Sequence, residues 1–305
     1  MKLRSLAAQL ALFLAGCATV PAAEPLKLAI TIDDLPVHGE APSGENPASV
    51  ADAMVKALLE GGAREAHGFV NGVWTERDPS AHGILAEWRK AGLPLANHGW
   101  AHRHLNDMTL DEFERELVRN EALLAGLATK GEWSWFRYPF LGEGDTAEKR
   151  ADARRILARR GYRVAAVTMD FSDWQWTGPY ARCADAGDTA AIARLEHSYL
   201  DSARQSIRFH RGLAQGLYGR DIPYVLLLHV SGMTARMMPR LLRLYRSEGF
   251  EFVSLEEAQR DPAYADQMDP ALPALPQGLE GKARSRGLAL PPRTDYAPLL
   301  EGICR

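Results

Sequence analysis

The chain has 305 residues, with 36 Lys and Arg against 39 Asp and Glu, a formal charge of -3 at pH 7, and three cysteines. A composition with 46% hydrophobic and 25% charged residues excludes a disordered tail, a collagen-like chain and a disulfide-built mini-protein. Because neutralising phosphates requires a basic face, the slight negative charge also argues against nucleic acid as a partner.

The N-terminus has the pattern of an export signal. Lys2 and Arg4 precede an apolar run at residues 6–15, which is shorter than the roughly 20 residues of a membrane-spanning helix. We therefore expect this run to be a cleaved signal rather than a membrane span.

The signal ends in Leu14-Ala15-Gly16-Cys17, which resembles the lipobox of bacterial lipoproteins. The resemblance implies a signal peptide over residues 1–16, a lipidated Cys17 and a linker over 17–25. The protein would then be lipid-anchored in the cell envelope on the periplasmic side, with membrane association through Cys17 only. The residue after Cys17 is Ala18 rather than the Asp that would signal retention in the inner membrane, and this favours the outer membrane. The alternative is an ordinary secretory signal cut near residues 22–23.

Short apolar runs alternate with helical stretches over most of the remaining chain. We expect strands at residues 26–32, 66–70, 93–96, 135–137, 164–169, 224–228 and 250–253. This alternation predicts a parallel sheet. Since few of the runs alternate polar and apolar residues, the pattern favours a barrel with helices outside.

Three helices are predicted in more detail. Residues 80–91 carry apolar positions at helical spacing and end at Gly92. Residues 109–127 begin with a Thr-x-x-Glu capping box. Residues 188–217 form one long helix with an approximate apolar face.

Residues 261–305 form a C-terminal tail with seven prolines and little helical or strand periodicity. If Cys17 is lipidated, Cys183 and Cys304 remain, in a compartment where disulfides persist. We expect the two to pair and to anchor the tail; two free buried thiols are the alternative.

Titratable residues gather where the predicted strands end, which is where a parallel barrel places its active site. Asp33 and Asp34 close the first strand. Neighbours along a strand point to opposite sides, but a turn at the strand end can direct both inward with different roles. A helix cap or turn is the structural alternative, because Asp favours both.

His98 and His102 form a second group after a short apolar run. On a helical turn, two histidines separated by three residues lie on one face and can bind one metal ion. With one carboxylate they form a three-ligand set that leaves a position for water, as in catalytic zinc sites. A surface or capping position is the alternative, and the nearby His104 leaves open which pair is used.

Five short motifs occur in order along the chain, at residues 31–35, 98–102, 137–140, 170–174 and 227–229. They match T-F-D-D-G, H-S/T-x-x-H, R-x-P-Y, D-x-x-D-W and L-x-H, and together they resemble the polysaccharide deacetylase (NodB homology) family, carbohydrate esterase family 4. The resemblance implies a distorted (β/α)7 barrel, which we place at residues 26–260.

The resemblance also implies a site. Asp34, His98 and His102 would hold a divalent metal, most often Zn2+. Asp33 would be the general base, and Arg137 would pair with it.

The general acid would be His229, oriented by Asp173. A backbone N–H at Phe140 would stabilise the oxyanion, and Trp174 and Leu227 would line an apolar slot for the acetyl methyl group. For the last two, ordinary core packing is the alternative.

The chain departs from the family pattern at the rim of the expected cleft. Leu35-Pro36, Gly99, Phe140 and Val230 stand where the family has a Gly, a Ser or Thr, a Tyr and often an acid. None of these changes removes a group that the mechanism needs. Residues 177–223 form an insertion longer than the family leads us to expect.

We therefore expect a metal-dependent hydrolase that removes N- or O-acetyl groups from an envelope or extracellular polysaccharide, peptidoglycan or oligosaccharide. One alternative is hydrolysis of another small amide, imide or ester at the same site, because loops rather than the fold select the acyl acceptor. The other is a non-catalytic carbohydrate-binding lipoprotein.

Overall fold

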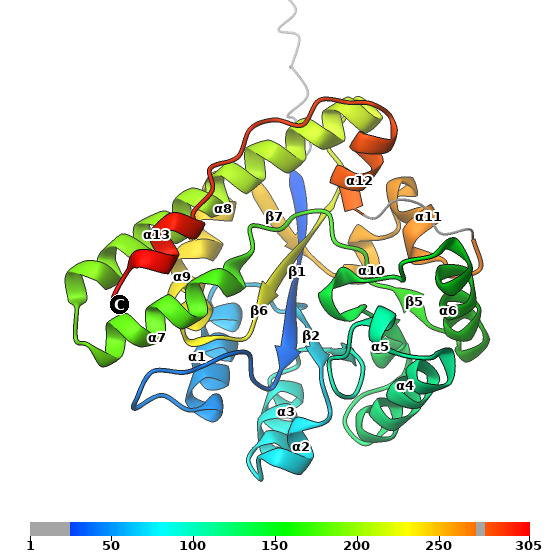
Figure 1. Ribbon diagram of the computed structural model, residues 1–305, viewed down its shortest axis with the longest axis horizontal. Coiled ribbons are helices and arrows are strands. Elements are labelled where there is room, and N and C mark those ends of the chain that lie inside the picture. Colours follow the sequence, from blue (N-terminus) through cyan, green and yellow to red (C-terminus); the bar gives the residue numbers. More distant parts are fainter. Residues whose placement is uncertain (1–24, 273–277) are drawn as a thin grey trace, which may run out of the picture.

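A computed structural model describes residues 25–272 and 278–305 of the protein. Parallel strands form a curled sheet with helices packed around it (Figure 1). The strands are β1 (Leu26–Leu35), β2 (His67–Val70), β3 (Leu95–Asn97), β4 (Trp135–Phe136), β5 (Arg163–Val164), β6 (Tyr224–His229) and β7 (Phe250–Val253). The signal peptide and lipid anchor expected over residues 1–17 lie outside the described residues.

The central strand is β1. The strand order is β5-β4-β3-β2-β1-β6, and β7 pairs in parallel with the first residues of β1. Beyond β5, Met169 forms a parallel bridge with Leu226 of β6, so the chain returns to the other edge of the sheet and closes the curl. The distorted (β/α)7 barrel expected from the sequence is confirmed.

The strand expected over residues 164–169 is wrong in its extent, because the regular strand covers only Arg163–Val164. The amide of Val225 donates to the Thr168 hydroxyl at 2.9 Å, where a regular ladder would use a main-chain oxygen. The amides of Thr168 and Met169 both donate to the Val225 carbonyl. Because the Thr168 hydroxyl takes the place of a main-chain acceptor, regular pairing with β6 is interrupted, and the parallel bridge forms only at Met169.

The helices mostly follow the predicted alternation with the strands. They are α1 (Pro47–Glu60), α2 (Trp74–Arg77), α3 (Ala81–Lys90), α4 (Leu110–Ala125), α5 (Lys130–Trp133), α6 (Ala147–Arg160), α7 (Thr177–Asp185), α8 (Thr189–Tyr218), α9 (Gly232–Ser247), α10 (Leu255–Ala258), α11 (Ala265–Met268), α12 (Gly278–Ser285) and α13 (Ala297–Gly302). Short 3-10 turns are η1 (Leu105–Asp107), η2 (Pro139–Leu141), η3 (Asp173–Trp176) and η4 (Pro262–Tyr264).

The three helices predicted in detail are confirmed as α3, α4 and α8. The capping box of α4 is present, because the amide of Glu112 donates to the Thr109 hydroxyl and the Glu112 carboxylate accepts from the Thr109 amide. In the part of the chain that the structure describes, no helix has both the length and the apolar character of a membrane span.

The C-terminal tail lies along α8 and is more structured than expected (Figure 1). Although it shows little periodicity, it forms η4, α11, α12 and α13. Leu279, Ala283 and Leu300 of these helices are buried. Such short helices are stabilised by tertiary packing rather than by their own sequence.

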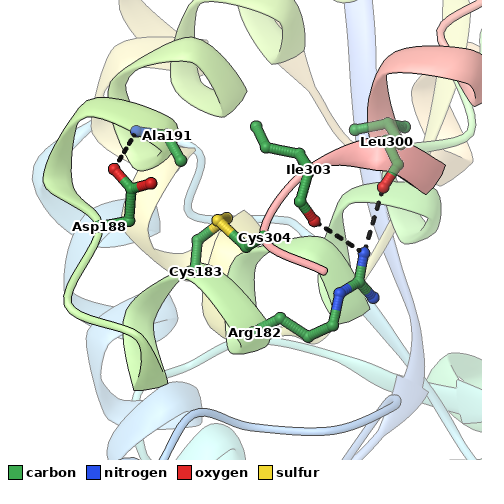
Figure 2. The surroundings of a disulfide bond; sticks show 7 residues. All are labelled: Arg182, Cys183, Asp188, Ala191, Leu300, Ile303 and Cys304. Atoms are coloured by element: carbon green, nitrogen blue, oxygen red, sulfur yellow. Dashed lines mark hydrogen bonds between the residues drawn. A yellow bond between two sulfur atoms is a disulfide. The ribbon is translucent and has the colours of Figure 1, made fainter.

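The expected disulfide anchors the end of this tail. Cys183 of α7 and Cys304 are bonded, with their Cα atoms 5.2 Å apart. Beside it, Arg182 Nη2 donates to the carbonyls of Leu300 (3.2 Å) and Ile303 (3.3 Å), as Figure 2 shows. The insertion and the tail are therefore fastened to each other.

Candidate active site

The end of β1 brings two neighbouring carboxylates to the same side. The pairing of β1 with β2 changes register between Ile32 and Leu35, and Asp34 has a φ of 67°. This left-handed conformation is uncommon for residues other than glycine, although Asp adopts it more readily than most. As a result, both carboxylates approach one atom: His98 Nε2 lies 3.6 Å from Asp33 Oδ2 and 3.3 Å from Asp34 Oδ1.

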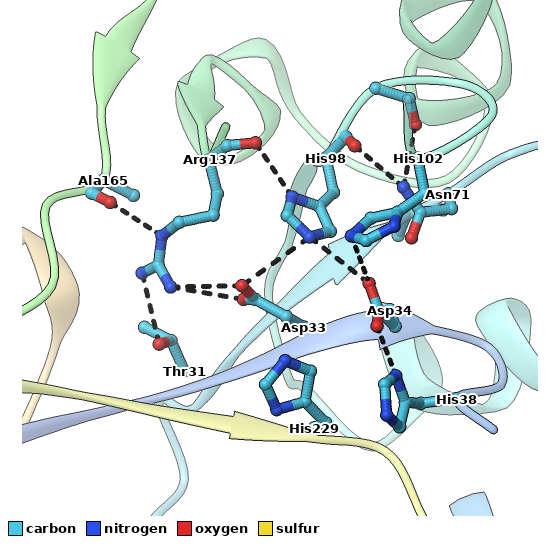
Figure 3. Close-up of polar contacts among 12 residues, drawn as sticks. Thr31, Asp33, Asp34, His38, Asn71, His98, His102, Arg137, Ala165 and His229 are labelled. Atoms are coloured by element: carbon cyan, nitrogen blue, oxygen red, sulfur yellow. Dashed lines mark hydrogen bonds and ion pairs between the residues drawn. The ribbon is translucent and has the colours of Figure 1, made fainter. Parts of the chain in front are cut away.

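Three side chains converge as a candidate metal centre (Figure 3). One ligand atom each from Asp34, His98 and His102 lies within 4.8 Å of the others. His98 Nδ1 lies 2.8 Å from the carbonyl oxygen of Arg137. Because a carbonyl only accepts, Nδ1 carries the proton and Nε2 presents its lone pair to the centre.

The electrostatics of these three residues suit a divalent cation. Asp34 Oδ1 is buried without a hydrogen-bond partner, although it lies 3.2 Å from His102 Nε2. Burial lowers the pKa of His102 to about 4, against the opposing charge of Asp34, so the ring is neutral at pH 7. The site thus brings together one carboxylate oxygen and two imidazole nitrogens, a set of ligand atoms that fits Zn2+.

Asp34 stays ionised at neutral pH in spite of its position. Burial raises its pKa, but the hydrogen bond from His38 and the imidazoles of His98 and His102 lower it further. The net effect holds the pKa of this carboxyl well below its usual range.

The prediction of a helical turn at residues 98–102 is wrong. The segment is a loop in which Gly99 and His102 have φ values of 75° and 50°. Asn71 Nδ2 donates to the carbonyls of His98 (2.8 Å) and Gly99 (3.2 Å), and Glu116 accepts from the Ala101 amide. The Asn71 and Glu116 side chains thus satisfy main-chain groups of the loop, and the two imidazoles converge without a helix.

His104 does not belong to the metal centre. Its Nδ1 accepts a hydrogen bond from the Asn106 amide and so faces its own loop. The structure therefore selects His98 and His102 as the pair.

A second carboxylate, Asp33, is held by a fully buried guanidinium. Arg137 Nη1 lies 3.3 Å from both oxygens of Asp33. Its Nη2 donates to Thr31 Oγ1 and its Nε donates to the Ala165 carbonyl. The expected pairing of Arg137 with Asp33 is thus present in the structure.

On the neighbouring strand, His229 forms a pair with a buried carboxylate. Its Nδ1 lies 2.8 Å from Asp173 Oδ1, and its amide donates to Asp173 Oδ2 at 2.9 Å. Thr234 Oγ1 donates to the same Oδ2. Burial lowers the pKa of His229, but the charge and hydrogen bond of Asp173 outweigh it and raise the pKa to about 9.

The two pairs lie side by side, since Asp33 of β1 is the register partner of His229 of β6. At pH 7 His229 carries a proton, while Asp33 is fixed by a permanent cation. Asp33 can therefore accept a proton on one side of the centre, and His229 can release a proton on the other.

The three remaining predicted residues lie at different depths. The Phe140 side chain is 64% exposed and packs on the His102 ring, with centroids 4.5 Å apart. Trp174 is 49% exposed, whereas Leu227 is buried at 6%. The indole of Trp174 and the phenyl ring of Phe140 are thus accessible to a ligand, whereas Leu227 is buried on β6.

Sequence reasoning missed His38. Its Nδ1 lies 2.5 Å from Asp34 Oδ2, and its ring lies 4.7 Å from that of His229. The signal available was a histidine four residues after Asp34, in the turn that follows β1. No motif of the resembled family includes this position, so it was passed over.

Comparison with known proteins supports the same family. The polysaccharide deacetylase family model matches residues 22–165. A family 4 carbohydrate esterase from Streptomyces lividans, solved with acetate, is 19% identical with a TM-score of 0.50, over 78% of this chain and 97% of that one. The peptidoglycan deacetylase PdaC from Bacillus subtilis is 18% identical with a TM-score of 0.50, over 79% and 95%.

A third similar structure is a pseudoenzyme of the same carbohydrate esterase family. The wild-type protein from Bacillus anthracis is 14% identical with a TM-score of 0.55, over 77% of this chain and 66% of that one. At these identities the solved structures show a shared fold. The family model and the fold agree: residues 22–165 match the polysaccharide deacetylase family, and the domain has the fold of carbohydrate esterase family 4.

Proposed function

We propose that this protein hydrolyses N- or O-acetyl groups on an envelope or extracellular polysaccharide, peptidoglycan or oligosaccharide, using a divalent ion, most often Zn2+. The observation that carries the proposal is the buried, unpartnered Asp34 Oδ1 facing the Nε2 atoms of His98 and His102. When bound, the ion supplies Lewis-acid polarisation and lowers the pKa of water.

The protein's own residues then divide the proton transfers. Asp33 takes the proton of the attacking water, and Arg137 keeps its carboxylate in place for this role. His229, protonated at pH 7 through Asp173, delivers a proton to the departing amine or alcohol. The main-chain N–H of Phe140 donates to the developing oxyanion.

The exposed aromatic rings supply the surface for the glycan. Trp174 is in η3, directly after Asp173, and its half-exposed indole offers a face on which a sugar ring can stack. Leu227, buried on β6 two residues before His229, lines the apolar slot for the acetyl methyl group. A stacked sugar and a buried methyl group would orient the acetyl carbonyl toward the centre.

We further propose that the protein acts in the cell envelope as a lipoprotein anchored through Cys17. The disulfide between Cys183 and Cys304 supports export, because such bonds persist in oxidising compartments.

The experiment that tests this function is acetate release from a panel of N-acetylated and O-acetylated glycans. We expect release by the purified protein, loss of release with a chelator, and recovery on addition of Zn2+. The His98→Ala, His102→Ala double variant should neither bind the metal nor release acetate. Release that is unaffected by complete metal removal would reject the proposal, as would metal bound to the double variant as well as to the wild type.

A further inference from the structure

The geometry points to His38 as a positioning residue: we propose that it holds Asp34 as a one-oxygen ligand and thereby sets the affinity of the centre for its divalent cation. This inference rests on the proposed function and adds a residue to it. None of the matched motifs contains His38, and the residue lies in the turn after β1 where the chain departs from the family pattern.

The two oxygens of Asp34 have different surroundings. Oδ1 faces His98 and His102 at 3.3 and 3.2 Å, whereas Oδ2 faces His38 Nδ1 at 2.5 Å (Figure 3). An ionised carboxylate only accepts, so Nδ1 of His38 carries the proton and donates it. Charge-assisted hydrogen bonds of this kind are short and strong.

Asp34 Oδ2 lies within hydrogen-bond distance of His38 Nδ1, whereas Asp34 Oδ1 is buried without a hydrogen-bond partner. The backbone conformation does not by itself select one staggered rotamer for the Asp34 side chain. Rotation would turn Oδ1 away from the imidazoles. The bond to Oδ2 fixes the plane of the carboxylate and directs Oδ1 to the centre.

His38 is itself held in place by the neighbouring strand. Its amide donates to the carbonyl of Val230 at 3.0 Å, directly after β6. Its ring packs against the His229 ring, and 24% of its side chain is exposed. The residue therefore joins the end of β6, which carries the proposed acid, to the ligand at the end of β1.

A ligand role for His38 fits the geometry less well. Its Nδ1 is directed at Asp34 Oδ2, on the side away from His98 and His102. Among the described residues, the group whose ligand atoms converge is Asp34, His98 and His102. His38 thus acts on the ion through Asp34.

The test is the Zn2+ affinity of the purified full chain at one fixed pH, measured by competition with a chromophoric chelator. The His38→Phe variant keeps a ring but loses the donor, and the His38→Asn variant places an amide N–H near the position of Nδ1. We expect affinity to fall about 10- to 100-fold in His38→Phe and to stay within about threefold of wild type in His38→Asn.

Two controls separate positioning from other effects. His82 is an exposed histidine on α3, so His82→Phe should leave the affinity unchanged. The absorption bands of the Co2+-loaded protein should have wild-type positions in His38→Asn and shift in His38→Phe. If His38→Phe does not fold, as judged by circular dichroism, His38→Ala takes its place with the same expectation.

The outcomes distinguish this inference from the function on which it rests. If the wild type binds Zn2+ and His38→Phe or His38→Ala binds it equally well, the positioning role is overturned while the metal centre stands. If the wild type binds no Zn2+, the proposed function itself fails. An Asn variant as weak as the Phe variant would also contradict positioning by a hydrogen bond.

Discussion

Replacing Asp173 with Asn tests how the proposed acid keeps its proton. The substitution preserves the shape of the side chain and leaves an oxygen that can still accept from His229 Nδ1, at the position now 2.8 Å away. It removes the negative charge and also one acceptor, because an NH2 group replaces Oδ2, which accepts from the His229 amide and the Thr234 hydroxyl. That charge is the main influence raising the pKa of His229 against the effect of burial.

The magnitude follows from the two pKa values. The wild-type pKa is about 9 and the ordinary value is 6.5, and burial alone acts to lower it. A protonated acid is lost as pH rises through its pKa, so at pH 8 about 90% of the wild-type His229 carries a proton. If the pKa returns to its ordinary value of 6.5, the fraction is about 3%, which predicts an activity about 30-fold lower at pH 8.

The assay is the pH dependence of kcat/KM for acetate release, together with an NMR titration of the imidazole. We expect the alkaline limb of the profile to move from about pH 9 toward pH 6.5 in Asp173→Asn. Thr234→Val is a matched control, because it removes a hydroxyl that donates to Asp173 but leaves the carboxylate and imidazole together. An alkaline limb that does not move in Asp173→Asn would refute the reasoning.

The remaining predictions concern the leaving group, the disulfide and the anchor. His229→Ala should lower hydrolysis of an acetamide by about 10² to 10⁴ but an activated aryl acetate much less, because a phenolate leaves without a proton; equal losses on both substrates would contradict the acid role. Cys304→Ser should lower the free energy of unfolding by about 2 to 4 kcal/mol in denaturant titrations without reductant, since the bond closes a loop with a sequence separation of 121. An unchanged midpoint would show that the disulfide does not stabilise the fold. Intact mass of membrane-extracted protein should show a lipidated chain that begins at Cys17, and a first residue beyond Cys17 would remove the anchor.

The fold was predictable because its strands are short, apolar and separated by helical stretches. The strand expected over residues 164–169 was the exception. It is interrupted because the Thr168 hydroxyl accepts a hydrogen bond from the Val225 amide, and hydrophobic periodicity does not reveal such a bond. The C-terminal helices α12 and α13 were missed for a related reason, because their stability depends on burial against the domain rather than on their own pattern.

The site was predictable where a motif fixes both residue type and order. Asp33, Asp34, His98 and His102 were found in this way, although the loop at Gly99 was mistaken for a helical turn. His38 was missed because its contact with Asp34 depends on the turn after β1 and on a hydrogen bond to the end of β6. Contacts made by turns have no characteristic spacing in the sequence.

The central claim is that two adjacent carboxylates have different roles, one as a metal ligand and the other as a base. The most direct measurement is Zn2+ content and acetate release, determined on the same samples of wild type, Asp33→Asn and Asp34→Asn. We predict that Asp34→Asn loses metal, because a ligand loses its charge, whereas Asp33→Asn keeps full metal and loses turnover by about 10² to 10⁴. Near wild-type acetate release by fully loaded Asp33→Asn would contradict the account, as would equal metal contents in all three proteins.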